Sequence, residues 1–259
     1  WSSDVCSSDL DVHTIQDFVI PDFWLRFRTF DYGSYEPWAC LWWAVSPGVE
    51  INNRYLPRGC LVCYREWYGC RAEHPSNDKD NSVTNLAPEN WSNKDMAHGI
   101  IERTEERFDG QPTYTDKFPF NNLGGRTIAK EFQDAGVKLS LGDTDRKNGA
   151  AQMSSKLIGE KLIAGSEERW PMMVFFQSCK YCQDYIPMIE RHPNEARLWD
   201  YVEDGEPTHI VDCCRLAAMA NKVIIDAPTV IDEAFTNNVL ANPRNKKTTV
   251  RDIVPNLTF

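Results

Sequence analysis

The sequence predicts a mixed α/β fold in which helices cover both faces of one sheet. Three strand-like segments follow one another near the start, and helical and strand-like segments alternate after them. The 259 residues are 42% apolar, which is enough to bury one large core. Because the first three segments have short connections, we expect them to pair as an antiparallel meander.

The first three strands are expected in alternating or strongly apolar segments. An alternating run covers residues 26–31, and an apolar run with three tryptophans covers residues 38–46. Residues 47–57 predict a loop, and residues 59–68 predict the third strand. Trp42 and Trp43 lie inside the apolar run, so we assign them to the core rather than to a base-stacking surface.

After a polar segment over residues 71–92, the chain alternates between helices and short strands. Ser92 or Asn93 can cap a helix that runs to about Arg107, and Gly136 ends a helix over residues 125–135. The other expected helices cover residues 150–163, 178–190 and 208–220, and the other expected strands cover residues 113–115, 137–141 and 171–176.

The two ends of the chain are expected to lie outside this fold. Ser-Ser-Asp occurs twice in residues 1–10, and DVCSSDL over residues 4–10 matches the translation of a widely used sequencing adapter. We therefore interpret residues 1–10 as an artefact and expect the natural upstream sequence to be missing. The rest divides into an entry segment (11–25), one main domain (26–220) and an Asn- and Pro-rich tail (221–259).

Charge and composition exclude several classes of protein. The net charge is −10, or −8 without the two acids of residues 1–10, which argues against a general nucleic-acid coat. It does not exclude a nuclease, because carboxylates can bind divalent cations that face phosphate. No apolar run reaches the roughly 18 residues of a membrane span. The nine cysteines indicate reduced thiols, and Cys179-x-x-Cys182 has no second pair at zinc spacing.

Three aspartates stand where strands end or a helix starts. Asp31 ends the first strand, Asp116 follows the strand over residues 113–115, and Asp212 lies in the first turn of the last helix. Carboxylates that converge at one sheet edge repel one another unless divalent cations lie between them. Two such ions roughly 4 Å apart can activate water for phosphodiester cleavage. With 38 acidic residues in the chain, spacing alone leaves chance placement open.

The flanking residues carry a family resemblance. RFRTFDYGSYEPWACLWWAVS, over residues 26–46, resembles the opening of the nuclease domain in the large terminase subunit of tailed phages. That family has a strand, an Asp, an aromatic residue and a Gly, and then an aromatic-rich strand. Similar blocks follow in order at residues 56–69, 142–153, 171–176 and 209–217. The resemblance covers residues 21–220 and implies a ribonuclease H-like fold for the main domain.

The family's acids carry over one residue at a time. Asp31 matches the first-strand acid, and Asp212 matches the acid three positions after the histidine of the last helix. Asp116 matches the middle acid less closely, because Lys117 stands where the family usually has proline, and Asp109 is the alternative. A further matching block contains two acids that are either loop residues or neighbours of the site, Asp143 and Asp145.

Other polar residues have both a functional and a structural interpretation. His209 either orients a catalytic acid or relays a proton one helical turn from Asp212, or it has no chemical role. Glu66, on the third strand, is a further candidate to approach the site. Four basic residues either contact DNA phosphates or form a solvated surface: Arg126, Lys130, Arg146 and Lys147.

The resemblance implies an endonuclease that cuts concatemeric double-stranded DNA during genome packaging, with two Mg²⁺ or Mn²⁺ ions as cofactors. The implied partners are the portal protein, the small terminase subunit and an ATPase domain, whose P-loop this chain lacks. The implied location is the host cytoplasm, at the procapsid portal and not in the mature virion. Two alternatives stay open: another ribonuclease H-like nuclease, such as a resolvase or transposase core, and a catalytically silent module that docks DNA or the portal.

Overall fold

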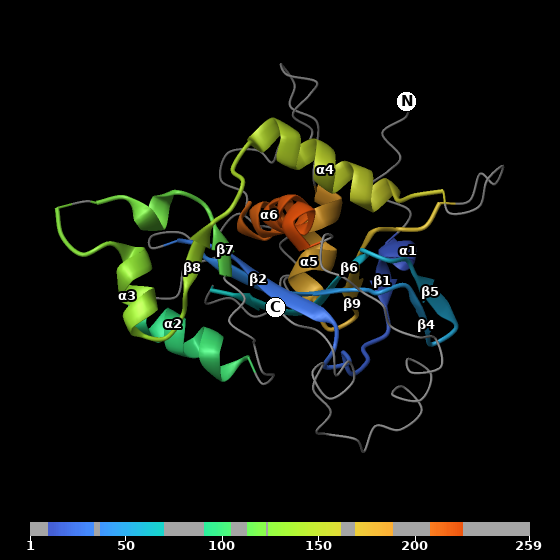
Figure 1. The fold of residues 1–259 in the computed structure, drawn as a ribbon, viewed down its shortest axis with the longest axis horizontal. Helices are drawn as coiled ribbons and strands as arrows, with labels where there is room; N and C mark the ends of the chain where they lie inside the picture. The colour runs from blue at the N-terminus through green and yellow to red at the C-terminus, as the bar shows by residue number, and fades with distance from the viewer. Residues whose placement is uncertain are drawn as a thin grey trace, which may run out of the picture.

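The structure is a computed structural model, and it describes residues 10–33, 37–69, 91–104, 113–122, 124–161, 169–188 and 208–224. Asp109, residues 1–9 and the tail from residue 225 lie outside the described residues. The described residues form a seven-stranded sheet and a separate two-stranded sheet (Figure 1).

The centre of the large sheet is the antiparallel meander that the sequence predicts. β2 (Leu25–Asp31), β3 (Ala39–Val45) and β6 (Leu61–Tyr68) pair in that order, and Asp31 lies opposite Ala39. Every residue of β3 is buried, as expected for a central strand with both faces covered.

Parallel strands complete both sides of the meander, so the sheet is mixed. β7 (Thr113–Thr115) pairs with β2, and β8 (Leu139–Leu141) pairs with β7. On the other side, β9 (Met173–Phe176) pairs with β6, and β1 (Thr14–Ile15) pairs with β9. The strand order is β1-β9-β6-β3-β2-β7-β8. Part of the segment predicted as an entry region therefore belongs to the sheet.

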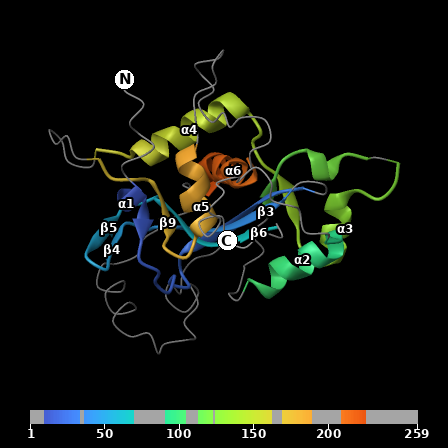
Figure 2. The ribbon, with the colours of Figure 1, turned by 180° about the vertical axis from the view of Figure 1, so that it is seen from behind.

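Helices lie on both sides of the sheet, which confirms the predicted layers (Figures 1 and 2). One side carries α4 (Arg146–Ile158), α5 (Lys180–Tyr185) and α6 (His209–Ile224), and the other carries α2 (Asn93–Glu102) and α3 (Ile128–Asp134). The short elements are α1 (Leu10–His13), η3 (Phe118–Phe120) and η4 (Ile186–Met188). In the described part of the chain, no helix has the length and hydropathy that a membrane crossing requires.

Aromatic side chains from the central strands fill the core. Trp38, Trp42 and Trp43 are fully buried. The indole N–H of Trp43 donates to Thr29 Oγ1 at 2.9 Å, and that of Trp42 donates to Thr104 Oγ1 at 3.0 Å. The assignment of Trp42 and Trp43 to the core is therefore confirmed.

The cysteines of the described residues are buried free thiols. Cys179 begins the segment that leads into α5, and its Sγ lies 4.0 Å from the Sγ of Cys63 on β6. Burial raises the pKa of the Cys63 thiol well above its ordinary value. The hydrogen bond to Cys63, together with burial, does the same to the pKa of Cys179. The pair Cys179 and Cys182 therefore packs in the core in this structure.

Several predicted boundaries were wrong, and each difference has a local cause. Residues 47–57 hold a hairpin, β4 (Val49–Ile51) and β5 (Arg54–Leu56), because Asn52 and Asn53 adopt the positive φ values (52° and 60°) that such a turn requires. The helix predicted over residues 150–163 spans Arg146–Ile158 instead. Asp145 caps its start, and Gly159, with a φ of 78°, follows its end.

The four other predicted helices also differ at their ends, and the one predicted over residues 125–135 spans Ile128–Asp134, with Thr127 as its N-cap. α2 ends at Glu102 rather than near Arg107, and its start has a full capping box between Ser92 and Asp95. The helix predicted over residues 178–190 is shorter, because α5 gives way to a 3₁₀ turn at Pro187, which has no N–H to donate. α6 extends to Ile224 rather than to residue 220.

Candidate active site

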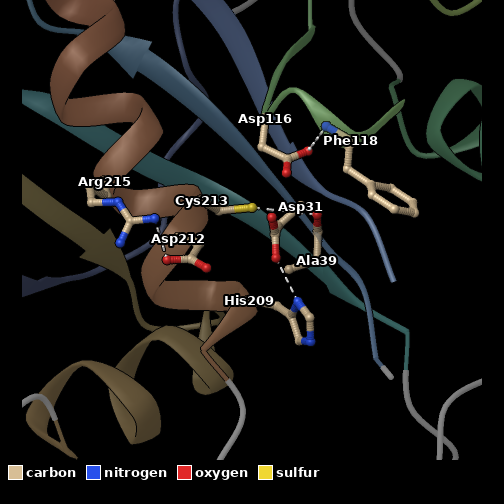
Figure 3. Close-up of polar contacts among 8 residues, drawn as sticks. All are labelled: Asp31, Ala39, Asp116, Phe118, His209, Asp212, Cys213 and Arg215. Atoms are coloured by element: carbon tan, nitrogen blue, oxygen red, sulfur yellow. Dashed lines mark hydrogen bonds and ion pairs between the residues drawn. The ribbon is translucent and has the colours of Figure 1, made fainter. Parts of the chain in front are cut away.

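The register of β2 and β7 brings two acids to the same edge of the sheet. These strands are parallel, and Arg28 pairs with Thr113 and Thr29 with Tyr114. Continuing that register places Asp31, the last residue of β2, level with Asp116, which directly follows β7. Figure 3 shows both side chains directed into the same space beyond the strand ends.

The start of α6 brings the third acid to this edge. The N–H of Asp212, in the first turn, donates to the carbonyl of Thr208 at 2.8 Å. The thiol of Cys213 donates to the carbonyl of Ala39 at 3.4 Å, and Ala39 lies opposite Asp31 in the β2–β3 register. α6 is therefore fixed to the end of the meander, and Asp212 faces Asp31 (Figure 3).

The three carboxylates influence one another electrostatically. Burial raises the pKa of Asp31 to about 6, and the negative charges of Asp212 and Asp116 add to this effect, while His209 opposes it. Burial also raises the pKa of Asp116, and the charge of Asp212 adds to the rise. The ionised forms therefore repel one another in a site where little water can screen them.

Each carboxylate also has its own partner. Asp31 Oδ2 lies 2.6 Å from His209 Nδ1, and the imidazole donates to the carboxylate when Asp31 is ionised. Asp116 Oδ1 accepts a hydrogen bond from the N–H of Phe118 at 3.2 Å. Asp212 Oδ1 forms an ion pair with Arg215 Nη2 at 2.6 Å. The structure thus brings His209 together with the three predicted acids.

Arg215 is a residue of this site that the sequence analysis did not predict. Its signal was the three-residue spacing from Asp212, which places both side chains on one face of a helix. Gly149 on α4 leaves room for it, because a Cβ at that position would lie 2.4 Å from Arg215 Cγ. The packing of α4 on α6 therefore holds the guanidinium beside Asp212.

The donor chemistry of the site suits a hard divalent cation. Carboxylate oxygens are the ligands that Mg²⁺ and Mn²⁺ prefer, and a cation between Asp31 and Asp116 would offset the burial and the neighbouring negative charges that raise their pKa values. Within the described ranges, no group of three or more His, Cys, Asp or Glu side chains is arranged to hold one metal ion. In this arrangement His209 contacts Asp31, and Arg215 contacts Asp212.

Asp143 and Asp145 form a local turn after β8, the strand beside β7. Asp143 Oδ1 accepts from the N–H of Asp145 at 3.1 Å, and Asp145 Oδ1 accepts from the N–H of Asn148 at 3.0 Å to cap α4. Both side chains are exposed. They follow β8 at the sheet edge where Asp116 follows β7, but each already accepts a backbone hydrogen bond within its own turn.

The four basic residues lie on two exposed segments. Arg126 and Lys130 both form ion pairs with Asp134 of α3, the lysine at 3.2 Å. Arg146 and Lys147 occupy the exposed first turn of α4, next to Asp145. The structure therefore leaves their contact with DNA as a prediction.

Glu66 lies elsewhere and has a structural partner. Its two carboxylate oxygens accept hydrogen bonds from the backbone N–H groups of Tyr181 and Cys182, at 2.8 and 2.9 Å. These N–H groups belong to the first turn of α5, where a negative charge is stabilising. Glu66 therefore tethers α5 to β6.

The mixed sheet, its helical layers and the acids at one edge define a ribonuclease H-like fold. The chain has a TM-score of 0.54 and 12% identity to the nuclease domain of the P22 large terminase, over 86% of this chain and 97% of that domain. It has a TM-score of 0.56 and 12% identity to the large terminase of a thermophilic bacteriophage in complex with ADP, over 85% of this chain.

The chain spans only 44% of that thermophilic phage's large terminase. No protein-family model and no curated protein matches the sequence. The solved structures confirm, at the level of the fold, the resemblance to large terminase nuclease domains that the sequence predicts.

Proposed function

We propose that this chain is a divalent-metal-dependent endonuclease that cuts concatemeric double-stranded DNA during phage genome packaging. The observation that carries this proposal is the convergence of Asp31, Asp116 and Asp212 at one sheet edge. The fold shared with large terminase nuclease domains supports the choice of DNA as substrate and of packaging as the process.

Asp31, Asp116 and Asp212 would hold two Mg²⁺ or Mn²⁺ ions. When bound, such ions activate a water molecule and stabilise the leaving oxygen in phosphodiester hydrolysis. His209 orients the Asp31 carboxylate through its Nδ1, and Arg215 orients Asp212. Asp143 and Asp145 stand beside the site, and the basic residues 126, 130, 146 and 147 contact the DNA backbone.

The proposed surroundings follow from the same process. The partners are double-stranded DNA, the portal protein, the small terminase subunit and an ATPase domain. The site of action is the procapsid portal in the host cytoplasm. The thermophilic phage protein, of which this chain covers 44%, is a large terminase solved with ADP, which supports the ATPase as a partner.

Plasmid cleavage tests the proposal. Supercoiled DNA is incubated with the chain in Mn²⁺, Mg²⁺ or EDTA, and nicked and linear products are separated on a gel. We expect nicking and linearisation in metal, none in EDTA, and no preference for branched DNA over linear duplex. Metal-independent cutting would contradict the mechanism, and a strong preference for branched DNA would indicate a resolvase-like nuclease.

A second candidate function is a catalytically silent module that docks DNA. It is favoured by the hydrogen bond of Asp31 to His209 and the ion pair of Asp212 with Arg215, which give two of the three acids partners within the protein. DNA binding without cutting, in either metal and with the ATPase domain restored, would support this candidate over the nuclease.

A further inference from the structure

An aromatic side chain is exposed directly beside the candidate metal ligands. Phe118 lies two residues after Asp116, at the start of η3, and 42% of its surface is exposed. Its backbone N–H donates to Asp116 Oδ1, so the carboxylate and the ring are held in one turn. Figure 3 shows the ring on the outer side of the space that the acids enclose.

Phe118 has a rigid support on one side. Its ring stacks on that of Tyr32, with 5.8 Å between centroids and 22° between planes, and Tyr32 directly follows Asp31. The hydroxyl of Tyr32 donates to Asn93 Oδ1 at 3.0 Å, and the amide of Asn93 donates to Glu131 Oε2 at 2.7 Å. The stacked pair is therefore anchored to α2 and α3.

A cation precedes this ring in the chain, and an exposed apolar residue ends the neighbouring strand β8. Lys117 is exposed, and its positive charge partly opposes the rise in the Asp116 pKa that burial causes. Leu141, which pairs with Thr115 at the end of β8, is 58% exposed. The exposed ring can stack on a base, and the lysine and a metal held by the carboxylates can bind the phosphate of the same nucleotide.

We propose that Tyr32 and Phe118 form a stacking platform for a base that leaves the DNA duplex beside the cleaved phosphodiester. This inference rests on the proposed nuclease function and specifies how its substrate is held. Stacking on an aromatic ring is independent of sequence, because every base has a π-face. The platform therefore favours DNA that is locally unpaired at the cut, without selecting a base.

The test compares two single strands that carry the same phosphates. One is a thymidine oligonucleotide, and the other is an abasic oligonucleotide of equal length. Affinities are measured by fluorescence anisotropy in Ca²⁺, with strand integrity checked on a gel. We expect the wild-type chain to bind the thymidine strand about tenfold more tightly, the effect of one good stacking contact.

Two variants locate the effect. Phe118→Leu keeps an apolar side chain without a ring and should make the two affinities equal, whereas Phe118→Trp should retain the preference. Phe120→Leu is the matched control, because Phe120 is 37% exposed in the same turn, and it should change nothing. Equal wild-type affinities for both strands, including undetectable binding of both, would overturn the platform. Equal losses in Phe118→Leu and Phe120→Leu would overturn it as well.

Plasmid cleavage by the same samples separates this inference from the proposed function. Cutting without any preference for the thymidine strand would refute the platform and leave the nuclease standing. A preference that depends on Phe118, in a chain that does not cut even with the ATPase domain restored, would refute the nuclease and leave nucleotide stacking standing.

Discussion

Glu66 and Asp31 are two carboxylates on strands of the same sheet, and the structure uses them in opposite ways. Both oxygens of Glu66 accept backbone hydrogen bonds from the start of α5. Asp31 has one hydrogen bond to His209 and faces the charges of Asp212 and Asp116. Both oxygens of Glu66 therefore have hydrogen-bond donors, whereas the Asp31 carboxylate is buried beside two other negative charges.

This difference indicates that Glu66 stabilises the fold and that Asp31 serves the function of the site. A carboxylate with matched donors contributes to folding, and its loss leaves those donors unpaired. A carboxylate among other carboxylates contributes little to folding when ionised, and is retained where it binds something positive. Substitutions at the two sites should therefore have opposite consequences.

The largest expected effect is the loss of cutting in Asp31→Asn and in Asp212→Asn. Removal of groups that merely orient a metal ligand costs about 10- to 100-fold, so loss of a ligand should cost at least about 100-fold in cleavage rate. The rate is measured on plasmid in Mn²⁺, with Glu66→Gln as the control. A rate in either Asn variant within a few-fold of wild type would contradict the assignment of that acid.

A smaller loss is expected in Arg215→Gln, because Asp212 loses the guanidinium that orients it. We expect cleavage to fall by about 10- to 100-fold, with a higher Mn²⁺ concentration required for half the maximal rate. Gly149→Ala should act in the same direction, since the new Cβ displaces Arg215 from α4.

Arg58→Gln is the control for the loss of one positive charge, because Arg58 is exposed outside the site. A loss of equal size in Arg58→Gln would show that Arg215 acts through general attraction of DNA and not through Asp212.

Glu66→Gln should lower the free energy of unfolding and preserve cutting by the folded chain. Two backbone N–H groups lose a charged acceptor, which costs about 1.5–3 kcal/mol. Urea denaturation measures the loss, and Glu50→Gln on an exposed position of β4 is the matched control. An unchanged midpoint would mean that Glu66 does not tether α5.

The smallest expected effect is a pH dependence of stability that requires Asp31. Its pKa is about 6 in the folded chain and 3.8 ordinarily, so the folded state holds a proton that the unfolded state releases between these values. The free energy of unfolding of the metal-free protein should therefore fall as pH rises from about 4 to about 6.

Asp31→Asn should lack this component, so wild type and variant are compared by urea denaturation in EDTA across that range. Parallel pH profiles for the two proteins would show that Asp31 is not destabilised by its neighbours.

The placement of the three acids could be predicted because strand ends and helix starts follow from local patterns. The alternation up to Asp31 marks the end of β2, and a second short strand-like segment ends just before Asp116. The parallel pairing of β2 and β7, which brings the two acids level, was not predicted from the sequence. Local sequence patterns do not show which side chain each acid contacts. The bond between His209 and Asp31 joins residues 178 positions apart, and only the packing of α6 on β2 creates it.

Other features escaped prediction for different reasons. Glu66 was a site candidate as an acid on the third predicted strand, but its role depends on where α5 begins. Phe118 gave no signal, since exposure of one aromatic residue in a turn is a property of the tertiary structure. The hairpin over residues 49–56 did have a signal, the Asn52-Asn53 pair.

Mn²⁺ binding by the full chain tests most directly whether the acids at the β2–β7 edge form a metal site. Titration followed by electron paramagnetic resonance counts bound ions in wild type, Asp31→Asn and Glu66→Gln without any DNA. We predict that wild type and Glu66→Gln bind Mn²⁺ equally well and that Asp31→Asn binds it far more weakly. Equal binding by all three proteins, or no binding by the wild type, would contradict the account.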